Sequence, residues 1–199
     1  MQRVFFKNRS FSPNFIGSWN LESIELCDEL INYFELNIKR QKKGVTSSGL
    51  NLDAKKSVDI SINPNEIKLP ENEVFYSYFE ALFLCHKDYL LQWPFLASFA
   101  SSVEIGSFNI QRYQAGEHFQ KIHSERTSIN SLHRILAWMT YLNDVDEGGT
   151  TYFEHYDLEI KPRKGLTLIW PAEWTHAHKG SVLHSGSKYI ITGWMDLCI

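Results

Sequence analysis

The 199-residue sequence has no run of about 18 consecutive apolar residues, so no transmembrane helix is expected. Its first residues, Met1 to Lys7, lack the apolar run of a secretory signal peptide. Only three cysteines occur, Cys27, Cys85 and Cys198, and their odd number and wide spacing argue against a disulfide framework or a cysteine zinc site. These absences predict a soluble, cytoplasmic protein with reduced thiols and no membrane partner.

The chain also lacks an excess of charge of either sign. Its 20 Lys and Arg and 23 Asp and Glu leave a net charge of −3, which gives no electrostatic reason to expect nucleic acid as a partner. Aromatic residues, in contrast, make up 14% of the chain, and 43% of the residues are hydrophobic. The length fits a single domain, and the aromatic content indicates a thick core or an aromatic-lined cavity.

The first hundred residues favour helices joined by irregular segments. Apolar residues recur every three or four positions from Ile24 to Ile38, after capping residues at 18–20 and before a cationic stretch that ends in Gly44. A second helix is expected over 71–89. The intervening 45–70 is expected to be a long loop that holds one short strand at Val58 to Ile62.

From about Ser101 the pattern changes to short β-prone runs separated by Gly, Pro and Asn-Asp turns. The expected strands lie within 103–113 and at 135–142, 150–153, 158–160, 166–170 and 189–194. Such a series is typical of an antiparallel sandwich or barrel. We therefore expect a mostly β fold with N-terminal helices (α+β): one domain over 1–199, with a helical support region over 1–100 and a β core over 101–199.

The histidines point to a metal site. If His123, Ser124 and Glu125 are extended, residues two apart project from the same face, so an imidazole and a carboxylate can meet at one cation. A third ligand from a distant strand would complete a two-histidine, one-carboxylate face, the arrangement of non-haem Fe(II) oxygenases. A His-x-Glu tripeptide alone also occurs by chance in many proteins. His176 and His178 both compete for the third position.

Several segments, taken in order, resemble the 2-oxoglutarate- and Fe(II)-dependent dioxygenases, in particular their prolyl 4-hydroxylase-like branch. The resemblance runs from about residue 110 to 196 and comprises 113–116, 123–125, Arg134, 141–153, 160–165 and 178–194. A further likeness to small phage-type and marine microbial members involves 170–180. The interval of ten residues before Lys188 favours His178 over His176 as the distal ligand.

The resemblance implies a role for each matching residue. Three would bind Fe(II) as the catalytic centre: His123, Glu125 and His178. Four would bind the co-substrate 2-oxoglutarate, the first at its far carboxylate: Lys188, Tyr113, Thr151 and Trp194. Apart from the resemblance, Arg134 is expected to face the pocket or its rim, where it could bind an anionic group of the substrate. Trp174 could line the mouth of the barrel near the substrate, or belong to an ordinary hairpin with buried tryptophans. Glu125 stands where the commonest family triad has Asp, and its charge argues against a halogenase, which has a small uncharged residue there.

The implied fold is a double-stranded β-helix (jelly roll), and the implied activity is hydroxylation of a substrate by O₂, coupled to decarboxylation of 2-oxoglutarate to succinate and CO₂. The substrate stays open between a proline in a peptide or protein, a free amino acid and another small metabolite, and so does a need for ascorbate. The loops 124–131 and 45–70 are expected to flank it. A metal-binding or sensing β-sandwich without turnover is the alternative from another class, and a zinc hydrolase would lack a general base near the ligands.

Overall fold

The computed structural model describes residues 1–5, 14–46 and 48–198. Phe6 and Lys7, part of the N-terminal stretch without a signal-like run, lie outside the described residues. In the part of the chain that is described, no helix has both the length and the apolar character needed to cross a membrane.

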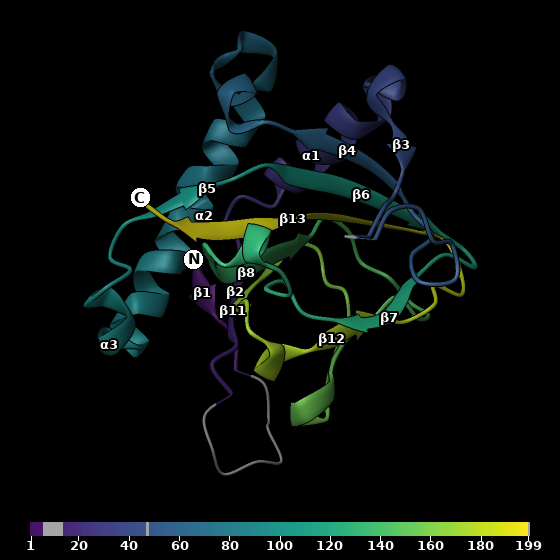
Figure 1. Cartoon of the computed structure of the whole chain (residues 1–199). Helices are drawn as coiled ribbons and strands as arrows, with labels where there is room; N and C mark the ends of the chain where they lie inside the picture. Colours follow the sequence, from purple (N-terminus) through teal and green to yellow (C-terminus); the bar gives the residue numbers. More distant parts are fainter. Residues whose placement is uncertain (6–13, 47, 199) are drawn as a thin grey trace.

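Two antiparallel sheets form the centre of the molecule, and helices cover the outer side of the larger one (Figure 1). The strand order is β1–β2–β11–β8–β13–β6–β4–β3 in the larger sheet, with β5 beside β13, and β10–β9–β12–β7 in the smaller. The strands are β1 Gln2–Arg3, β2 Gly17–Asn20, β3 Lys42–Lys43, β4 Val58–Ile62, β5 Val103–Ile105, β6 Phe108–Gln114, β7 Phe119–His123, β8 Arg134–Tyr141, β9 Thr151–Phe153, β10 Leu158–Ile160, β11 Leu166–Pro171, β12 His178–Gly180 and β13 Ser187–Leu197. The helices are α1 Glu25–Leu36, α2 Glu73–Gln92 and α3 Pro94–Ala97, with the 3-10 turns η1 Ile38–Arg40, η2 Pro64–Lys68, η3 Pro70–Asn72, η4 Ile129–Ser131, η5 Glu154–Tyr156 and η6 Trp174–His176.

The larger sheet is buried on both faces, and the alternation of side chains along its central strands explains this. In β8, Leu136 and Trp138 belong to the apolar cluster that includes α1 and α2, whereas Ala137 and Met139 belong to a second cluster between the sheets. On the helix side, the Tyr78 hydroxyl from α2 lies 2.8 Å from the Thr140 hydroxyl. The helices α1 and α2 therefore support the larger sheet from its outer face, and its inner face forms one wall of the site described below.

The observed fold agrees with the expected class, a sheet-rich jelly roll with N-terminal helices, and β4 lies at the residues predicted for it. The second helix is also present, shifted slightly to Glu73–Gln92. Because β2 and β4 come from the first hundred residues and join the larger sheet, the expected boundary near residue 100 does not separate helices from sheet.

The N-terminal segment differs from the prediction in two places. Residues 18–20, expected to cap a helix, belong to β2, which pairs with β11 and completely buries Trp19. The helix α1 then begins only at Glu25 and ends at Leu36, before the cationic stretch, which forms η1 and β3. Ile38, expected on the buried face, is 71% exposed. Pairing with strands far along the chain outweighs the local helical pattern here.

Candidate active site

A cavity of about 930 Å³ lies between the two sheets. Eight of the nine site residues expected from the sequence line it: Tyr113, His123, Glu125, Arg134, Thr151, His178, Lys188 and Trp194. The ninth, Trp174, is 68% exposed in η6, does not line the cavity, and packs edge-on against the ring of His155. The geometry therefore brings together the expected metal and co-substrate residues but leaves Trp174 outside.

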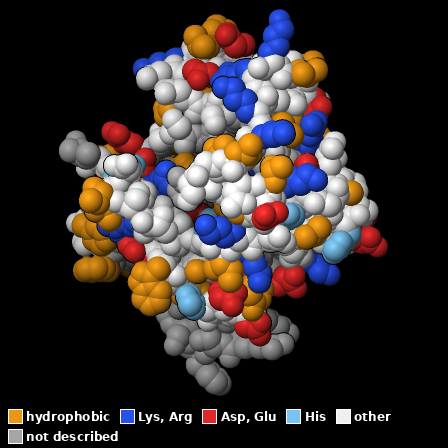
Figure 2. Space-filling view, turned by 45° about the vertical axis from the view of Figure 1, so that its right-hand side comes forward, with side chains coloured by type: hydrophobic (Ala, Val, Ile, Leu, Met, Phe, Trp, Pro, Cys, Tyr) orange, Lys and Arg blue, Asp and Glu red, His pale blue; other side chains and the backbone are white. Residues whose placement is uncertain are grey.

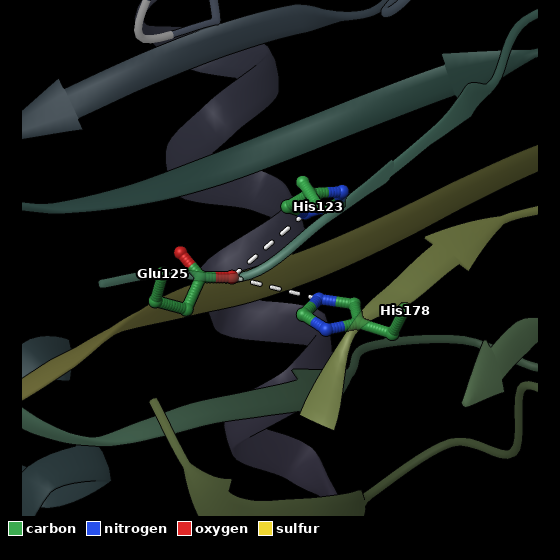
Figure 3. A group of neighbouring side chains, drawn as sticks. All are labelled: His123, Glu125 and His178. Carbon is green, nitrogen blue, oxygen red and sulfur yellow. Dashed lines mark ion pairs between the residues drawn. The ribbon is translucent and has the colours of Figure 1, made fainter. Parts of the chain in front are cut away.

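Two neighbouring strands and a following residue bring together three side chains that could hold a metal ion. His123 ends β7 and His178 begins β12, and the two are direct register partners in the smaller sheet. Glu125 follows two residues after β7, where its backbone N–H donates to the Ala172 carbonyl at 3.2 Å. Figure 3 shows its carboxylate between the two imidazoles, with Oε1 at 3.8 Å from Nε2 of His123 and 3.5 Å from Nε2 of His178.

The hydrogen bonds of the two imidazoles turn the correct nitrogen toward this point. Nδ1 of His123 lies 2.8 Å from the Lys121 carbonyl oxygen, and Nδ1 of His178 lies 2.9 Å from the His176 carbonyl oxygen. A carbonyl oxygen only accepts hydrogen bonds, so each Nδ1 carries the proton and each Nε2 keeps its lone pair. Backbone carbonyls of this kind commonly fix the tautomer and orientation of metal-binding histidines.

The protonation states also suit a cation. Burial, followed by the proximity of His178, lowers the pKa of His123 to about 4, so its imidazole is neutral at neutral pH. Burial alone would raise the pKa of Glu125, but the two histidines, the Trp194 indole and Arg134 outweigh it and lower the pKa. The ligand atoms lie within 4.8 Å of one another, which is wider than the ~3 Å expected for neighbouring ligands about 2.1 Å from an ion. Small side-chain movements would therefore fit this donor set to Fe(II), which the facial two-histidine, one-carboxylate pattern favours.

Trp194 and Arg134 hold the carboxylate in place. The indole Nε1–H of Trp194 donates to Oε2 of Glu125 at 2.7 Å, which leaves Oε1 facing the imidazoles. Arg134 donates to the backbone oxygen of Glu125 at 3.1 Å, and its guanidinium lies 3.5 Å from the centre of the Trp194 ring. The sequence analysis missed this contact of Trp194. The even spacing between Lys188 and Trp194 was the available signal, because it places both on one face of β13.

Lys188 is a buried cation without an acidic partner. Its side chain is 4% exposed, its Nζ donates to the Gly149 carbonyl at 2.9 Å, and it lies 4.4 Å from the centre of the Tyr113 ring. No carboxylate among the described residues pairs with it, and burial lowers its pKa to about 7. Gly149 has φ +64°, and a Cβ there would lie 3.2 Å from Cδ of Lys188. Glycine therefore suits both the backbone conformation of the turn and the close approach of the Lys188 side chain.

Two residues with hydroxyl groups, Thr151 and Tyr113, line the same cavity as this lysine. The Tyr141 hydroxyl donates to Oγ1 of Thr151 at 2.6 Å, which leaves the Thr151 proton free to donate into the cavity. The neighbouring Thr150 points away and bonds Glu159, so the choice of Thr151 over Thr150 agrees with the register. The Tyr113 hydroxyl donates to Oε1 of Gln111 at 2.7 Å.

His176 does not join the metal-binding group. It lies in η6 rather than on the strand assumed for it, and its Nε2 is 2.8 Å from the Asn14 carbonyl oxygen. Its own carbonyl oxygen is the partner of Nδ1 of His178. It therefore contributes to the orientation of the ligand through its backbone.

Sequence analysis also missed a polar network on the N-terminal side of the cavity. Lys55 and Asp59 form a buried ion pair at 2.6 Å, Ser57 donates to the same carboxylate at 2.8 Å, and Gln111 approaches it at 3.4 Å. Asp59 lies in the strand predicted at Val58 to Ile62, whereas Lys55 and Ser57 lie in the segment before it, which the sequence presents as an ordinary polar loop. No local pattern indicates that this loop packs against β6.

Known proteins match the part of the chain that carries the site. Residues 108–196 match the 2OG-Fe(II) oxygenase superfamily. Probable prolyl 4-hydroxylase 9 of Arabidopsis thaliana is 30% identical over 115 residues, covering 45% of this chain. Those residues span only 40% of that relative's length.

Two solved structures share the fold over almost the whole chain. The viral collagen prolyl hydroxylase of Paramecium Bursaria Chlorella virus-1, in a 2OG complex, aligns with a TM-score of 0.66 at 20% identity, over 93% of this chain and 97% of the viral one. A Trichoplax adhaerens prolyl hydroxylase, in complex with a hypoxia inducible factor oxygen degradation domain peptide fragment, aligns with a TM-score of 0.70 at 14% identity, over 92% of this chain and 84% of its own. Residues 108–196, which match the 2OG-Fe(II) oxygenase superfamily, hold all eight of the expected residues that line the cavity, and the relative and the two structures that the chain resembles are prolyl hydroxylases.

Proposed function

We propose that this protein is an Fe(II)- and 2-oxoglutarate-dependent dioxygenase that hydroxylates a substrate held in the cavity, with a peptidyl proline as the first candidate. In this proposal His123, Glu125 and His178 bind Fe(II). The whole chain, 1–199, acts as one catalytic domain. The cytoplasmic location expected from the sequence remains a prediction, which cell fractionation would test.

The observation that carries the proposal is the pairing of two features in one cavity. The metal-binding group alone would suit a sensor or a hydrolase. Lys188, however, is a buried cation with no acidic partner among the described residues, and such a charge is costly unless a ligand compensates it. A dicarboxylate that reached from the metal to Lys188 would supply the missing anion. A module that only bound a metal would have no use for this lysine.

Each residue has a task in the reaction. The bound iron and 2-oxoglutarate supply the oxidation: O₂ converts a substrate C–H bond to C–OH, and 2-oxoglutarate leaves as succinate and CO₂. Lys188 neutralises the far carboxylate, and the free proton of Thr151 donates a hydrogen bond to it. Trp194 keeps Glu125 ionised and aimed at the metal. The apolar walls around Trp170 and Ile190 keep bulk water from the reacting carbon.

Succinate formation tests the proposal most directly. Purified protein with Fe(II) and 2-oxoglutarate, with and without ascorbate, is screened against a panel of proline-containing peptides and free metabolites. We expect succinate in an amount equal to the hydroxylated product. His123→Ala should lose both Fe(II) binding and turnover, whereas His184→Ala, an exposed histidine outside the cavity, should retain both.

The alternatives give different results in the same experiments. A metal sensor would bind Fe(II) but not 2-oxoglutarate, both as the unaltered protein and as Lys188→Met. Selective turnover of a free amino acid or metabolite would keep the dioxygenase and replace the peptidyl substrate. Failure to bind 2-oxoglutarate in the presence of Fe(II) would refute the dioxygenase itself.

A further inference from the structure

The charges of the molecule are unevenly distributed between the cavity and the rest of the surface. Of the 20 Lys and Arg, two (Lys7 and Arg9) lie outside the described residues, and eight of the remaining 18 line the cavity. Only two of the 23 Asp and Glu do so. The described residues outside the cavity therefore include ten Lys and Arg and 21 Asp and Glu. A chain with a net charge of −3 thus has a strongly positive cavity.

Neither acid in the cavity is available to neutralise a cationic substrate. Glu125 belongs to the metal-binding group and accepts the indole N–H of Trp194. Asp59 is paired with Lys55 and also accepts the Ser57 hydroxyl. The positive charge around the mouth is therefore not compensated by these two carboxylates.

Four exposed lysines form the outer part of this charge, and we call them the rim lysines: Lys39, Lys42, Lys43 and Lys121. Lys42 and Lys43 lie on β3, the edge strand of the larger sheet, whereas Lys121 lies on β7 of the smaller sheet, so cations flank the mouth from both sheets (Figure 1). Figure 2 shows Lys and Arg side chains distributed around the hollow in this side of the molecule. Among the described residues no carboxylate pairs with any rim lysine, in contrast to Arg40, which pairs with Glu66 at 2.7 Å.

We propose that the substrate is an acidic peptide segment, with carboxylate side chains that flank the hydroxylated residue and bind the rim lysines. This inference rests on the proposed function and names the substrate class of the same cavity. Lys42 and Lys43 also protect an edge strand from pairing with other chains. That role does not explain Lys121 or the inward-facing Lys55 and Arg134, which extend the positive charge toward the metal-binding group.

A peptide fits these observations better than the other anions. The 21 acids outside the cavity would repel the continuous phosphate backbone of a nucleic acid, which is usually bound along an extended basic surface. A single small anion would be bound by the cations inside the cavity, such as Lys188 and Arg134, and the rim lysines on the two sheets would remain without a partner. The cavity of about 930 Å³ also leaves room beside 2-oxoglutarate for a residue and its neighbours.

Binding of matched peptides tests the inference separately from turnover. Three labelled ten-residue peptides carry a central proline flanked only by Glu, only by Gln or only by Lys. Their affinities are measured by fluorescence anisotropy under nitrogen, on protein loaded with Fe(II) and 2-oxoglutarate. We expect the Glu peptide to bind at least about tenfold more tightly than the Gln peptide at 50 mM NaCl, and to lose most of this advantage at 500 mM NaCl.

Variants identify the residues responsible. Lys121→Gln and the double variant Lys42→Gln/Lys43→Gln should each weaken binding of the Glu peptide by about two- to fivefold per lysine, with no effect on the Gln peptide. Lys161→Gln removes an exposed lysine outside the cavity and should change neither affinity.

Three results would overturn the inference. Equal binding of the three peptides by a protein that still binds 2-oxoglutarate would refute the acidic substrate and leave the dioxygenase intact. Tighter binding of a labelled ten-residue oligodeoxythymidine, or displacement of the Glu peptide by free glutamate at equal concentration, would refute the peptide. A protein that bound no 2-oxoglutarate would remove the proposed function and, with it, this inference.

Discussion

Replacement of Lys188 by methionine should stabilise the ligand-free protein while it removes the response to 2-oxoglutarate. Burial lowers the pKa of Lys188 from 10.5 to about 7, so the folded state binds this proton less tightly than the unfolded chain does. At neutral pH the difference corresponds to a penalty on the order of 5 kcal/mol. Part of this is offset by the bond to Gly149 and the contact with Tyr113, which methionine would lose.

The pH range of the effect follows from the same two pKa values. Between about pH 7 and 10.5 the unfolded chain holds the proton that folded Lys188 has released, so stability from this group rises with pH. Below about pH 7 the full penalty is present, and above 10.5 it disappears. Lys188→Met should therefore be more stable than the unaltered protein by about 2–4 kcal/mol below pH 7, with the advantage shrinking toward pH 10.

Thermal unfolding with and without ligand measures both parts. For a chain of this size about 3 kcal/mol corresponds to a rise in Tm of roughly 6–12 °C. When every protein is already loaded with a divalent metal, we expect added 2-oxoglutarate to raise the Tm of the unaltered protein and of the control Lys161→Met, and to leave the Tm of Lys188→Met almost unchanged. A Lys188→Met protein that is less stable at pH 6.5, or that keeps the full ligand response, would refute the description of Lys188 as an uncompensated buried cation.

Three further results are expected. Above pH 7, binding of 2-oxoglutarate should take up a proton, because Lys188 must be protonated again, and the affinity should weaken by up to about tenfold per pH unit toward pH 9. Calorimetry in buffers of different ionisation enthalpy measures the proton uptake, and an affinity independent of pH would contradict the expectation. Trp194→Phe keeps the ring but loses the donor to Glu125, so Fe(II) affinity should fall about 10- to 100-fold with little change in Tm, as titration with the metal would show. Gly149→Ala places a side chain on a residue with φ +64° beside Lys188, so it should destabilise the protein by about 1–2 kcal/mol and weaken 2-oxoglutarate binding. An unchanged Kd would show that the position of the Lys188 side chain tolerates a methyl group at residue 149.

The parts of this structure that could be predicted are those in which local pattern and long-range pairing agree. The strand β4 and the short strands after residue 101, except β7 and β12, follow from β-prone runs bounded by turn residues. The spacing of His123 and Glu125 predicts convergence on an extended segment; in the structure β7 ends at His123 and Glu125 lies two residues beyond it, and both side chains still face the same point. Within the resemblance, the interval to Lys188 favours His178. No local pattern predicts which distant segment each strand pairs with.

The missed features all depend on such partners. Trp19 lies in a segment that reads as a helix cap, yet pairing with β11 makes it a strand. Lys55 lies in a polar stretch that resembles any surface loop, and its ion pair with Asp59 of the predicted strand β4 is buried because β4 pairs with β6. Charged residues in such a stretch give no sign of burial until the strand beside them is known.

The strand β13 explains why the metal-binding and co-substrate ends of the cavity can be fixed relative to each other. Lys188, Ile190, Thr192 and Trp194 are successive inward residues of this strand, and all four line the cavity. The six residue steps from Lys188 to Trp194 span about 20 Å of backbone. Because β6 and β8 pair with β13 on its two sides, neither end can move without breaking a ladder of hydrogen bonds. Lys188 and the residue that orients Glu125 are therefore parts of one rigid element, so the distance from the anion anchor to the metal-binding group is set by the strand and not by loops.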